Sequence, residues 1–423
     1  MEVGTITTAP ADTTVLAQPL RLPCGLVLPN RILKAAMTEG LANVWTGDVT
    51  PALIRLYQRW AEGGAGTLVT GLLSIERGVV VPGIPSVALD SRTDTALLRQ
   101  WAAGVHRRDT RLIGQVLHPG RQATVFAARH PVAPSALPPV QNSRMFGSSR
   151  ALTVEQIEAL IDRFAAAAAM LADAGFDGVE LHAAHGYLLG QFLSPETNRR
   201  TDDWGGNLPR RARFLLQTVR AVRRRVPPGF AVAVKINASD FRPGGFDVED
   251  SATVVGMLGA EGVDLVEISG GTYESDTTCA GIQPGEPGTS QDAYFAGLAP
   301  RLRAMTDIPL ALTGGLRSRH VMERLVGGHT VDVIGLGRPL IERPDLPRDL
   351  VNGTTDGIDL TPCPLPRRDE HSWWGHQFRH LASGGGFDPG YTARQARRDT
   401  ALSLLTQLAA TTRQRAASLL QHG

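Results

Sequence analysis

The chain has 423 residues, of which 42% are hydrophobic and 20% are charged, and its 43 basic and 41 acidic side chains leave a formal net charge of +2. This near balance excludes the basic field of a nucleic-acid-binding protein and the acidic composition of a disordered tail, so we expect a small-molecule partner and no nucleic acid. The length suits one large α/β domain with extensions, or two ordinary domains.

The spacing of the cysteines and the absence of long apolar runs indicate the cellular compartment of the protein. Cys24, Cys279 and Cys363 are too scattered for a disulfide framework, a zinc ribbon or an iron–sulfur cluster, which is typical of a reducing cytoplasm. No segment approaches the roughly 20 apolar residues of a membrane span, and the N-terminal stretch lacks a secretion signal. We therefore expect a cytoplasmic protein without membrane contact, with residues 1–17 as a mobile leader.

Eight apolar runs predict β-strands, and helical patterns lie between them. The predicted strands are Ile32 to Ala36, Thr67 to Thr70, Leu112 to Leu117, Gly178 to His182, Ala231 to Ile236, Leu265 to Ile268, Pro309 to Leu312 and Val331 to Gly335. Eight strands alternating with helices favour a single α/β fold, the parallel (β/α)8 TIM barrel, because each helix must return the chain to start the next parallel strand.

Local signals mark where two of the helices begin and end. Thr50 followed by Pro51 has the cap-then-proline order of a helix start, and two glycines at 63–64 end that helix. Thr153 and Gln156 predict a capping box before a long helix that stops near Gly175. A doubly wound open sheet is the weaker alternative, because AAMTEG after the first strand contains no G-x-G-x-x-G turn.

Residues with chemical capability follow the predicted strands, where barrel enzymes place their active sites. Strand four is followed by His182, His185 and Tyr187 within six residues. Neutral imidazoles can donate N–H groups to one carbonyl oxygen, and a phenol can deliver a proton from another direction. The glycine turns after strands seven and eight, together with Arg338, are typical of a phosphate site.

Several motifs together resemble the Old Yellow Enzyme family of FMN-dependent ene-reductases, also called the NADH:flavin oxidoreductase family. They are LPNRILKAAMTEG from Leu28, GQVLHPGRQA from Gly114, PVAPSA from Pro131, the block from Gly178 to Phe214, SGGTYE from Ser269, TGG from Thr313 and GLGRPLI from Gly335. Their agreement in order and spacing is far more specific than a lone glycine motif. The resemblance covers roughly residues 18 to 345 and implies bound FMN, with NADH or NADPH as the reductant.

The resemblance also implies a role for each site residue. Thr38 would contact the C4 carbonyl edge of the flavin, Gln115 its pyrimidine edge, and Lys235 the region of N1 and the C2 carbonyl, where a positive charge stabilises the reduced flavin. His182 and His185 would hold the substrate carbonyl oxygen, and Tyr187 would protonate the carbon alpha to it. The remaining expected flavin contacts are Ala36, Met37, Gly71 and Ser269, and for the phosphate Gly314, Gly315, Gly337 and Arg338.

The function implied is NAD(P)H-dependent reduction of the activated C=C bond of an α,β-unsaturated carbonyl compound. Two alternatives stay open. One is a related enzyme of a biosynthetic pathway that catalyses dehydrogenation, isomerisation or NAD(P)H oxidation. The other is a non-catalytic flavin-binding barrel, which the presence of His182, His185 and Tyr187 disfavours.

The sequence departs from the family pattern at three positions near the expected flavin. Ala36 stands where the family often has proline, and Lys235 stands where it commonly has arginine, which keeps the charge but loses the forked geometry. Lys34 lies in a strand that should be largely buried. We expect it to face a solvated pocket or to pair with Glu39.

Some features have a simpler structural interpretation. Two histidines three positions apart also occur in zinc sites, but no third ligand accompanies them, so we expect no metal. We interpret His118 as a structural histidine, and the turn from Asp202 to Gly206 with Arg213 as a structural turn closed by an ion pair.

Beyond about residue 350 the family resemblance weakens. We expect three parts: the leader (1–17), an FMN-binding barrel (18–350), and a C-terminal extension (351–423) that packs on the barrel or a neighbouring subunit. For the extension's aromatic residues we favour packing on the outside of the barrel, and the alternative is that they cap an active site. They are Trp373, Trp374, His376, Phe378, Phe387 and Tyr391. Leucines between Thr400 and Gln421 suggest an amphipathic helix that docks on a protomer or partner, which leaves a homo-oligomer open.

Overall fold

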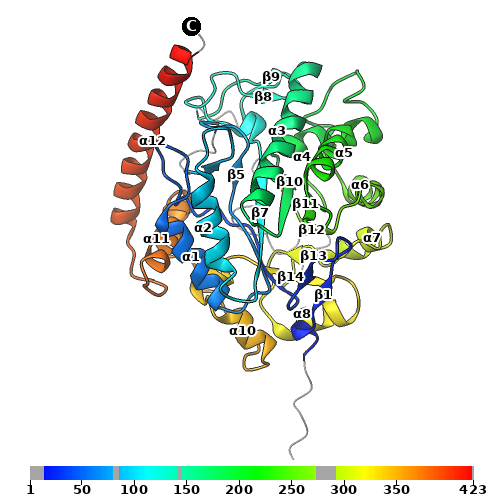
Figure 1. Ribbon diagram of the computed structural model, residues 1–423, viewed down its shortest axis with the longest axis vertical. Coiled ribbons are helices and arrows are strands. Elements are labelled where there is room, and N and C mark those ends of the chain that lie inside the picture. Colours follow the sequence, from blue (N-terminus) through cyan, green and yellow to red (C-terminus); the bar gives the residue numbers. More distant parts are fainter. Residues whose placement is uncertain (1–13, 80–84, 141–144, 273–291, 422–423) are drawn as a thin grey trace, which may run out of the picture.

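The computed structural model describes residues 14–79, 85–140, 145–272 and 292–421, and at its centre lies a closed barrel of eight parallel strands (Figure 1). The last barrel strand pairs with the first, so the ring is complete. In order around the ring the strands are β3 (Ile32–Lys34), β4 (Thr67–Val69), β7 (Arg111–Leu117), β10 (Gly178–Ala183), β11 (Ala231–Asn237), β12 (Leu265–Ser269), β13 (Leu310–Thr313) and β14 (Val333–Leu336). The predicted (β/α)8 barrel is confirmed.

Every predicted strand corresponds to one barrel strand, with ends that differ by two residues at most. The short strands outside the ring carry no periodicity that the sequence could show. A hairpin of β1 (Leu20–Arg21) and β2 (Val27–Leu28) precedes the barrel. The others are β5 (Leu73–Ser74) and β6 (Val87–Ala88), which extend the sheet beside β7, and β8 (Val132–Ala133) paired with β9 (Arg150–Ala151).

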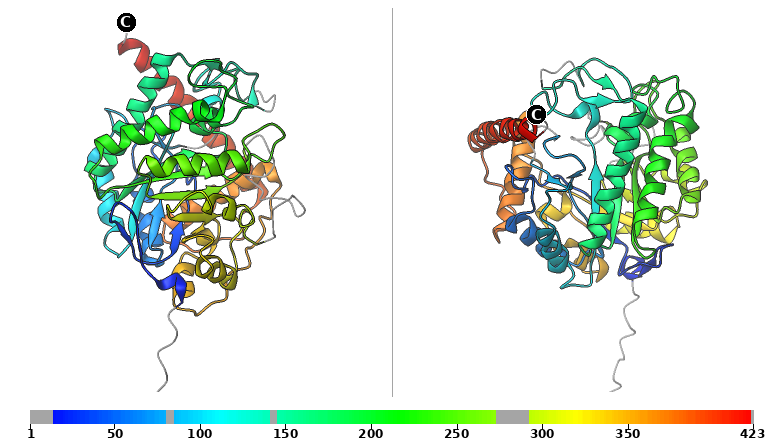
Figure 2. Two further views of the ribbon diagram at one scale, coloured as in Figure 1. Left: turned by 90° about the vertical axis from the view of Figure 1, so that its right-hand side faces the viewer. Right: turned by 45° about the horizontal axis from the view of Figure 1, so that its top comes forward.

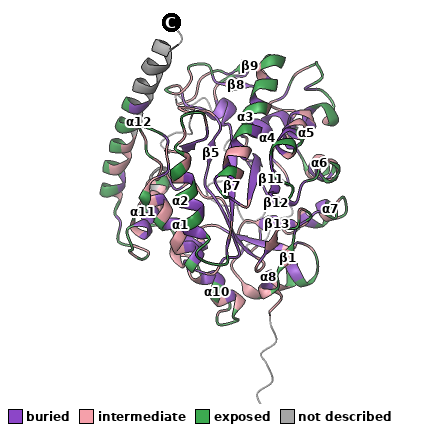
Figure 3. Cartoon of the chain, in the orientation of Figure 1, coloured by how far each residue is buried: buried purple, intermediate pink, exposed green. Residues whose placement is uncertain are grey.

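Helices surround the strands. The side of each helix that faces the strands is buried, and the side that faces away is exposed (Figure 3). The predicted caps are confirmed: Thr50 Oγ1 accepts a hydrogen bond from the Leu53 amide, and Thr153 and Gln156 form a capping box. The helices of the barrel region are α1 (Pro51–Glu62), α2 (Thr95–Val105), α3 (Val154–Asp173), α4 (Leu188–Leu193), α5 (Leu208–Arg225), α6 (Val248–Ala260), α7 (Ala299–Arg303), α8 (Arg319–Gly327), α9 (Pro339–Glu342) and α10 (Leu346–Val351), with 3-10 turns at Val15–Ala17 and Gly120–Gln122. Among the described residues no helix has the length and apolarity to cross a membrane.

The barrel interior has an apolar layer with a polar layer above it. The apolar layer lies toward the amino ends of the strands and includes Leu33, Val69, Ile113, Ala233, Leu265 and Ala311, against which the β1–β2 hairpin packs Leu22 and Leu28. The polar layer consists of four buried residues, each two positions after an interior residue of its strand and therefore pointing to the same side: Gln115, Glu180, Lys235 and Glu267. The polar layer therefore lies closer to the carboxyl ends.

The C-terminal extension forms α11 (Arg367–Ala382) and α12 (Ala393–Gln421). The right-hand view of Figure 2 shows these helices at one edge of the molecule, and α11 packs directly against α1, with the Phe378 ring edge-on to Trp60 at 6.1 Å. Trp373 and Tyr391 form a small core of the extension with Ala396. On α12, Leu402 and Leu405 are exposed. The side chains of Leu408, Leu419 and Leu420, like residues 1–13 of the leader and Cys279, lie outside the described residues.

A buried charge cluster joins β3, β4 and α1. Lys34 is fully buried and points away from the barrel axis, where its ammonium donates to Glu39 Oε1 at 3.2 Å and to the Val69 carbonyl at 2.9 Å. Tyr57 donates to the same Glu39 oxygen at 2.5 Å and accepts the Gly71 amide at 2.8 Å. Burial lowers the pKa of Lys34 to about 8, although Glu39 opposes this shift. Of the two expectations for Lys34, pairing with Glu39 is confirmed.

Removing one partner of this cluster should cost more than removing both. Glu39→Gln leaves a buried ammonium without its anion and should lower the free energy of unfolding by about 3–5 kcal/mol. Lys34→Met combined with Glu39→Gln should restore most of that loss, because no uncompensated charge remains. Guanidinium unfolding of the three proteins checks this, and a double variant no more stable than Glu39→Gln would show that the charge is not the source of the loss.

Candidate active site

Two adjoining cavities of about 230 Å³ each open at the carboxyl ends of the barrel strands. The glycine-side cavity is lined by the ends of β12, β13 and β14, including Ser269, Gly314, Gly315, Gly337 and Arg317. The histidine-side cavity is lined by Thr38, Leu72, Gln115, His182, Tyr187, Ile341, Trp374 and Phe378. Ala36, Met37, His185, Lys235 and Arg338 line both. The sequence-predicted site residues are thus gathered in one region, with one exception described below.

The glycine-side cavity presents cationic donors that fit a phosphate. Arg338 has no side-chain hydrogen bond or ion pair within the described part of the chain, and Arg317 has a buried Nε without a partner. Gly315 has a φ of +72°, and a Cβ there would lie 2.7 Å from the Tyr294 ring, so the turn requires glycine. Two guanidiniums with unused N–H groups beside a glycine turn are typical of phosphate recognition.

His182 is a neutral donor of known tautomer. Its Nδ1 accepts the Ala184 amide at 3.2 Å, so the imidazole proton lies on Nε2. Burial first, and then the nearby His185 and Lys235, lower the pKa of His182 well below its ordinary value. The side chain therefore stays neutral at physiological pH, and its Nε2–H is the group that can donate.

His185 is held by a second layer of hydrogen bonds. Its backbone is left-handed, with a φ of +57°, and its amide donates to Asn237 Oδ1 at 3.1 Å. Asn237 in turn donates to Asp240 at 2.8 Å, so Asp240 holds the amide that positions His185. His185 Nε2 lies 2.8 Å from the Ser269 hydroxyl. Burial and the charge of Lys235 lower the pKa of His185 to about 3, so this imidazole is also neutral.

Tyr187 completes the wall of the histidine-side cavity. It directly precedes α4, its side chain is 1% exposed, and it packs with Leu72 and Leu117. Its ring centroid lies 4.8 Å from that of His182, and the two imidazole centroids are 5.0 Å apart. The three rings therefore face one small volume, as the proposed division between carbonyl binding and protonation requires.

A charged network forms the floor of both cavities. Lys235 donates to Glu267 Oε1 at 2.7 Å, Thr313 donates to the same oxygen at 2.6 Å, and Gln115 Nε2 donates to Glu180 at 2.6 Å. Gln115 Oε1 is buried without a partner. Gln115 Oε1 is a free hydrogen-bond acceptor and Lys235 is a cation. Together they fit the pyrimidine part of a flavin, whose ring carries both N–H donors and carbonyl acceptors.

The structure separates some sequence candidates from the cavities. Gly71 lines neither cavity; a Cβ there would lie 2.1 Å from Glu39 Oε2, so it serves close packing behind Thr38. His118 is also outside, and its Nδ1 accepts the Gly120 amide at 3.0 Å. Arg213 pairs with Asp203 rather than with Asp202, which pairs with Arg200. No group of three potential metal ligands occurs among the described residues.

Sequence reasoning missed Arg317 and did not favour a site role for two aromatic residues of the extension. Trp374 and Phe378 of α11 line the histidine-side cavity, so these two aromatic residues do not simply pack on the outside of the barrel, as we expected. Trp374 Nε1 donates to Glu370 at 3.1 Å, which fixes its indole. Arg317 was overlooked, although its place two residues after the glycine turn of β13 is a signal that could have identified it.

Comparison with known proteins matches this geometry to a family. The model of the NADH:flavin oxidoreductase / NADH oxidase family matches residues 16–356. The chain belongs to this family. It is 37% identical over 358 residues to the NADH-dependent flavin oxidoreductase iliE of Hypocrea jecorina, covering 79% of this chain and 88% of that one.

Solved structures of Old Yellow Enzyme type have the same fold. Morphinone reductase is 26% identical with a TM-score of 0.68, and the match covers 82% of this chain and 92% of that one. A 2-naphthoyl-CoA reductase in complex with 2-naphthoyl-CoA is 26% identical with a TM-score of 0.73, over 80% of this chain and 52% of that one. As an NADH:flavin oxidoreductase the protein uses FMN, and the glycine turns, the two arginines and the floor of the cavities fit that cofactor.

Arg338→Ala should weaken retention of FMN. The substitution removes a guanidinium that has no partner within the described residues and can donate two hydrogen bonds to a phosphate, and charge-assisted hydrogen bonds are the strong ones. Equilibrium dialysis should show at least a tenfold rise in the dissociation constant, since such a bond is worth about 1.5–3 kcal/mol. Arg324→Ala on α8, which does not line either cavity, is the control, and equal retention by both variants would place the phosphate elsewhere.

Ligand binding at the histidines should not depend on imidazole titration. Because burial holds the pKa of His185 at about 3, its neutral form persists until the pH approaches that value. The charge-transfer band of FMN with a phenol should therefore show no inflection near the ordinary histidine pKa of about 6.5. Replacing both His182 and His185 with alanine should abolish the band and leave FMN bound. An inflection near that pH in the native protein would mean that an imidazolium binds the ligand.

Proposed function

We propose that this NADH:flavin oxidoreductase is an ene-reductase that reduces the activated C=C bond of α,β-unsaturated carbonyl compounds at the expense of NAD(P)H. The observation that carries the proposal is the meeting of His182, His185 and Tyr187 on one wall of a cavity whose floor is Lys235. This combination offers carbonyl polarisation, proton delivery and a cation for the reduced flavin in one volume.

Bound FMN would supply the hydride chemistry that couples oxidation of the nicotinamide to reduction of the alkene. The Lys235 ammonium and Gln115 Oε1, which has no other hydrogen-bond partner, would hold the pyrimidine part of the flavin. Arg338 and Arg317 would hold the phosphate. Lys235 keeps its position because its ammonium forms a buried ion pair with Glu267.

The histidine pair would receive the carbonyl oxygen of the substrate. As negative charge develops on that oxygen, the Nε2–H of His182 is already in place, because its Nδ1 is occupied by the Ala184 amide. A preorganised donor of this kind is worth roughly 3 kcal/mol in comparable oxyanion sites. His185, positioned by Asn237 and Ser269, would add a second donor, because an Nε2 that accepts from the Ser269 hydroxyl leaves the imidazole proton on Nδ1.

Tyr187 would then protonate the carbon alpha to the carbonyl. Its hydroxyl approaches from the side of the cavity beside His182, while Trp374 and Phe378 of the extension provide an apolar wall against which an alkene can rest. These walls also exclude water, which strengthens the hydrogen bonds inside the cavity.

The second candidate function is dehydrogenation or isomerisation of a carbonyl compound by the same residues. It is favoured by the relative from Hypocrea jecorina, whose name specifies NADH and flavin but no ene-reduction. In that direction the histidines would hold an enolate oxygen and Tyr187 would accept or return the proton. Anaerobic incubation with an enone panel separates the two, because only the ene-reductase consumes NAD(P)H in proportion to saturated product.

Tyr187→Phe should slow only the second half of the catalytic cycle. The ring and its packing remain and the proton donor is lost, and the loss of a general acid typically costs about 100-fold or more. Stopped-flow measurement should show near-normal reduction of the flavin by NAD(P)H and slow reoxidation by cyclohexenone. If the variant instead slows nicotinamide oxidation and leaves enone reduction unchanged, Tyr187 is a nicotinamide contact and the proton has another source.

A further inference from the structure

Inside the barrel, two buried carboxyl groups meet one ammonium. Glu180 and Glu267 have no exposed surface, and among the described residues Lys235 is the one cation that forms an ion pair with either of them. Two ionised carboxylates beside one ammonium would leave a surplus negative charge in the barrel interior, where an uncompensated charge is costly. The barrel interior therefore holds one more acidic group than its charges can balance.

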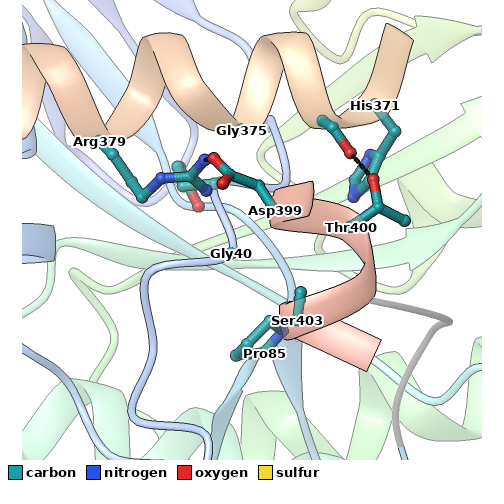
Figure 4. Close-up of a pocket in the computed structure, with 10 residues that line it drawn as sticks. Gly40, Pro85, His371, Gly375, Arg379, Asp399, Thr400 and Ser403 are labelled. Carbon is teal, nitrogen blue, oxygen red and sulfur yellow. Dashed lines mark hydrogen bonds and ion pairs between the residues drawn. The ribbon is translucent and has the colours of Figure 1, made fainter. Parts of the chain in front are cut away.

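A second pair of carboxylates, beside the C-terminal extension, has matched charges. Glu39 and Asp399 both line a cavity of about 210 Å³ between α11, α12 and the loop after β3 (Figure 4). Each has its own cation, because Lys34 donates to Glu39 and Arg379 donates to Asp399, both at 3.2 Å. Of these two pairs of carboxylates, the pair inside the barrel is the unbalanced one.

One oxygen of each barrel carboxyl has its donors. Glu180 on β10 is in register with Gln115 on β7, whose Nε2 donates to Glu180 Oε1 at 2.6 Å. Glu267 on β12 is in register with Lys235 on β11, whose ammonium donates to Glu267 Oε1 at 2.7 Å. Thr313 donates to the same Glu267 oxygen at 2.6 Å. Strand register thus fixes both carboxyl groups at one level of the barrel.

The other oxygen of each carboxyl has no donor among the described residues. Glu180 Oε2 and Glu267 Oε2 are both buried and unpaired, and buried polar atoms in this state are costly. The two carboxyl groups lie within hydrogen-bond reach of each other. Burial, and then the negative charge of Glu267, raise the pKa of Glu180 well above its ordinary value. One proton held between the two carboxyl groups would pair both oxygens and remove the surplus charge.

We propose that Glu180 and Glu267 share one proton, and that this proton keeps the charge next to the flavin balanced against Lys235. The inference rests on the proposed position of the flavin over Lys235, and it does not require ene-reduction. With the proton, one carboxylate faces one ammonium. Without it, a second negative charge next to Lys235 would oppose the addition of negative charge to the flavin on reduction.

The other titratable groups around the pair do not supply the missing positive charge. His182 and His185 are neutral, because burial and the charge of Lys235 lower their pKa values. Lys34 points away from the barrel axis and is paired with Glu39. Glu180 and Glu267 line neither of the two flavin-side cavities, whereas Lys235 lines both. The two acidic residues are therefore positioning residues, which act on the flavin through Lys235.

The reduction potential of bound FMN tests this role in four proteins: native, Glu180→Gln, Glu267→Gln and the double variant. Glutamine keeps the shape of glutamate and cannot ionise. In either single variant the remaining carboxylate pairs with Lys235, so the net charge is unchanged and the potential should stay close to the native value. The double variant leaves the ammonium without an anion and should favour the reduced flavin about tenfold or more, which is about 30 mV for a two-electron couple.

Glu261→Gln is the matched control, because its carboxylate pairs with Arg220 and lines neither flavin-side cavity. If both barrel carboxylates were ionised in the native protein, each single variant would remove one negative charge and raise the potential in similar steps. That result would overturn the inference. A double variant with the native potential would overturn it as well, because the charge of the network would then not act on the flavin.

Infrared spectroscopy of the native protein tests the proton itself and depends neither on turnover nor on the folding of the double variant. A protonated carboxyl group gives a C=O stretching band that shifts in heavy water. The native spectrum minus that of Glu180→Gln, and minus that of Glu267→Gln, should each contain this band, with and without FMN. Its absence from both differences would overturn the inference. A failure to reduce enones would contradict the proposed function and would leave the infrared and potential measurements to decide on the shared proton.

Discussion

The buried ion pair between Lys235 and Glu267 is the interaction on which the site depends. Both side chains lie inside the barrel with almost no exposure, and an ammonium there would be costly without its anion. Burial alone would raise the pKa of Glu267, but the charge of Lys235 and several hydrogen bonds outweigh it and lower the pKa. For Glu180, burial and the charge of Glu267 raise the pKa well above its ordinary value. One carboxylate is thus charged and the other neutral, which balances a single cation.

This balance fixes the state of the groups above it. Lys235 lines both cavities, and its charge adds to burial in lowering the pKa values of His182 and His185. A neutral imidazole is what an oxyanion site of this type needs, because it can donate an N–H without a change of charge before the reaction begins. The same ammonium that would stabilise the reduced flavin therefore also keeps neutral the two histidines that we propose bind the carbonyl oxygen.

The barrel and most of the site could be predicted because their signals are local. Each strand is a short apolar run, and each catalytic candidate lies at its carboxyl end or just beyond it, so strand order alone brings His182, Lys235 and Arg338 to one end of the barrel. The capping box at Thr153 is likewise a four-residue pattern.

What the sequence did not show depends on contacts between distant segments. Trp374 and Phe378 reach the cavity because α11 packs on α1, and nothing near residue 374 in the sequence reports that contact. The direction of Lys34 was ambiguous because a strand residue can face either the barrel axis or the helices, and only the place of Tyr57 on α1 decides it. Gly71 was assigned to the flavin by analogy, and it lines neither cavity because it packs against Glu39, where a Cβ would not fit.

The extension gives the barrel features that its strands do not encode. Trp374 and Phe378 of α11 place an apolar wall in the histidine-side cavity. Loops and appended segments commonly set what a barrel enzyme accepts, while the barrel itself sets the chemistry. The substrate preference of this protein should accordingly be sought in α11 as well as in the loops of the barrel.

The central claim is that a neutral histidine pair above a paired lysine receives the carbonyl oxygen. Nitrogen NMR of the FMN-loaded protein with isotope-labelled histidine tests it most directly, because the chemical shifts of Nδ1 and Nε2 report tautomer and charge separately. We expect His182 and His185 to be neutral at about pH 7, with the His182 proton on Nε2, and we expect that proton to shift when a phenol binds. An imidazolium at either position, or a His182 proton on Nδ1, would contradict the account.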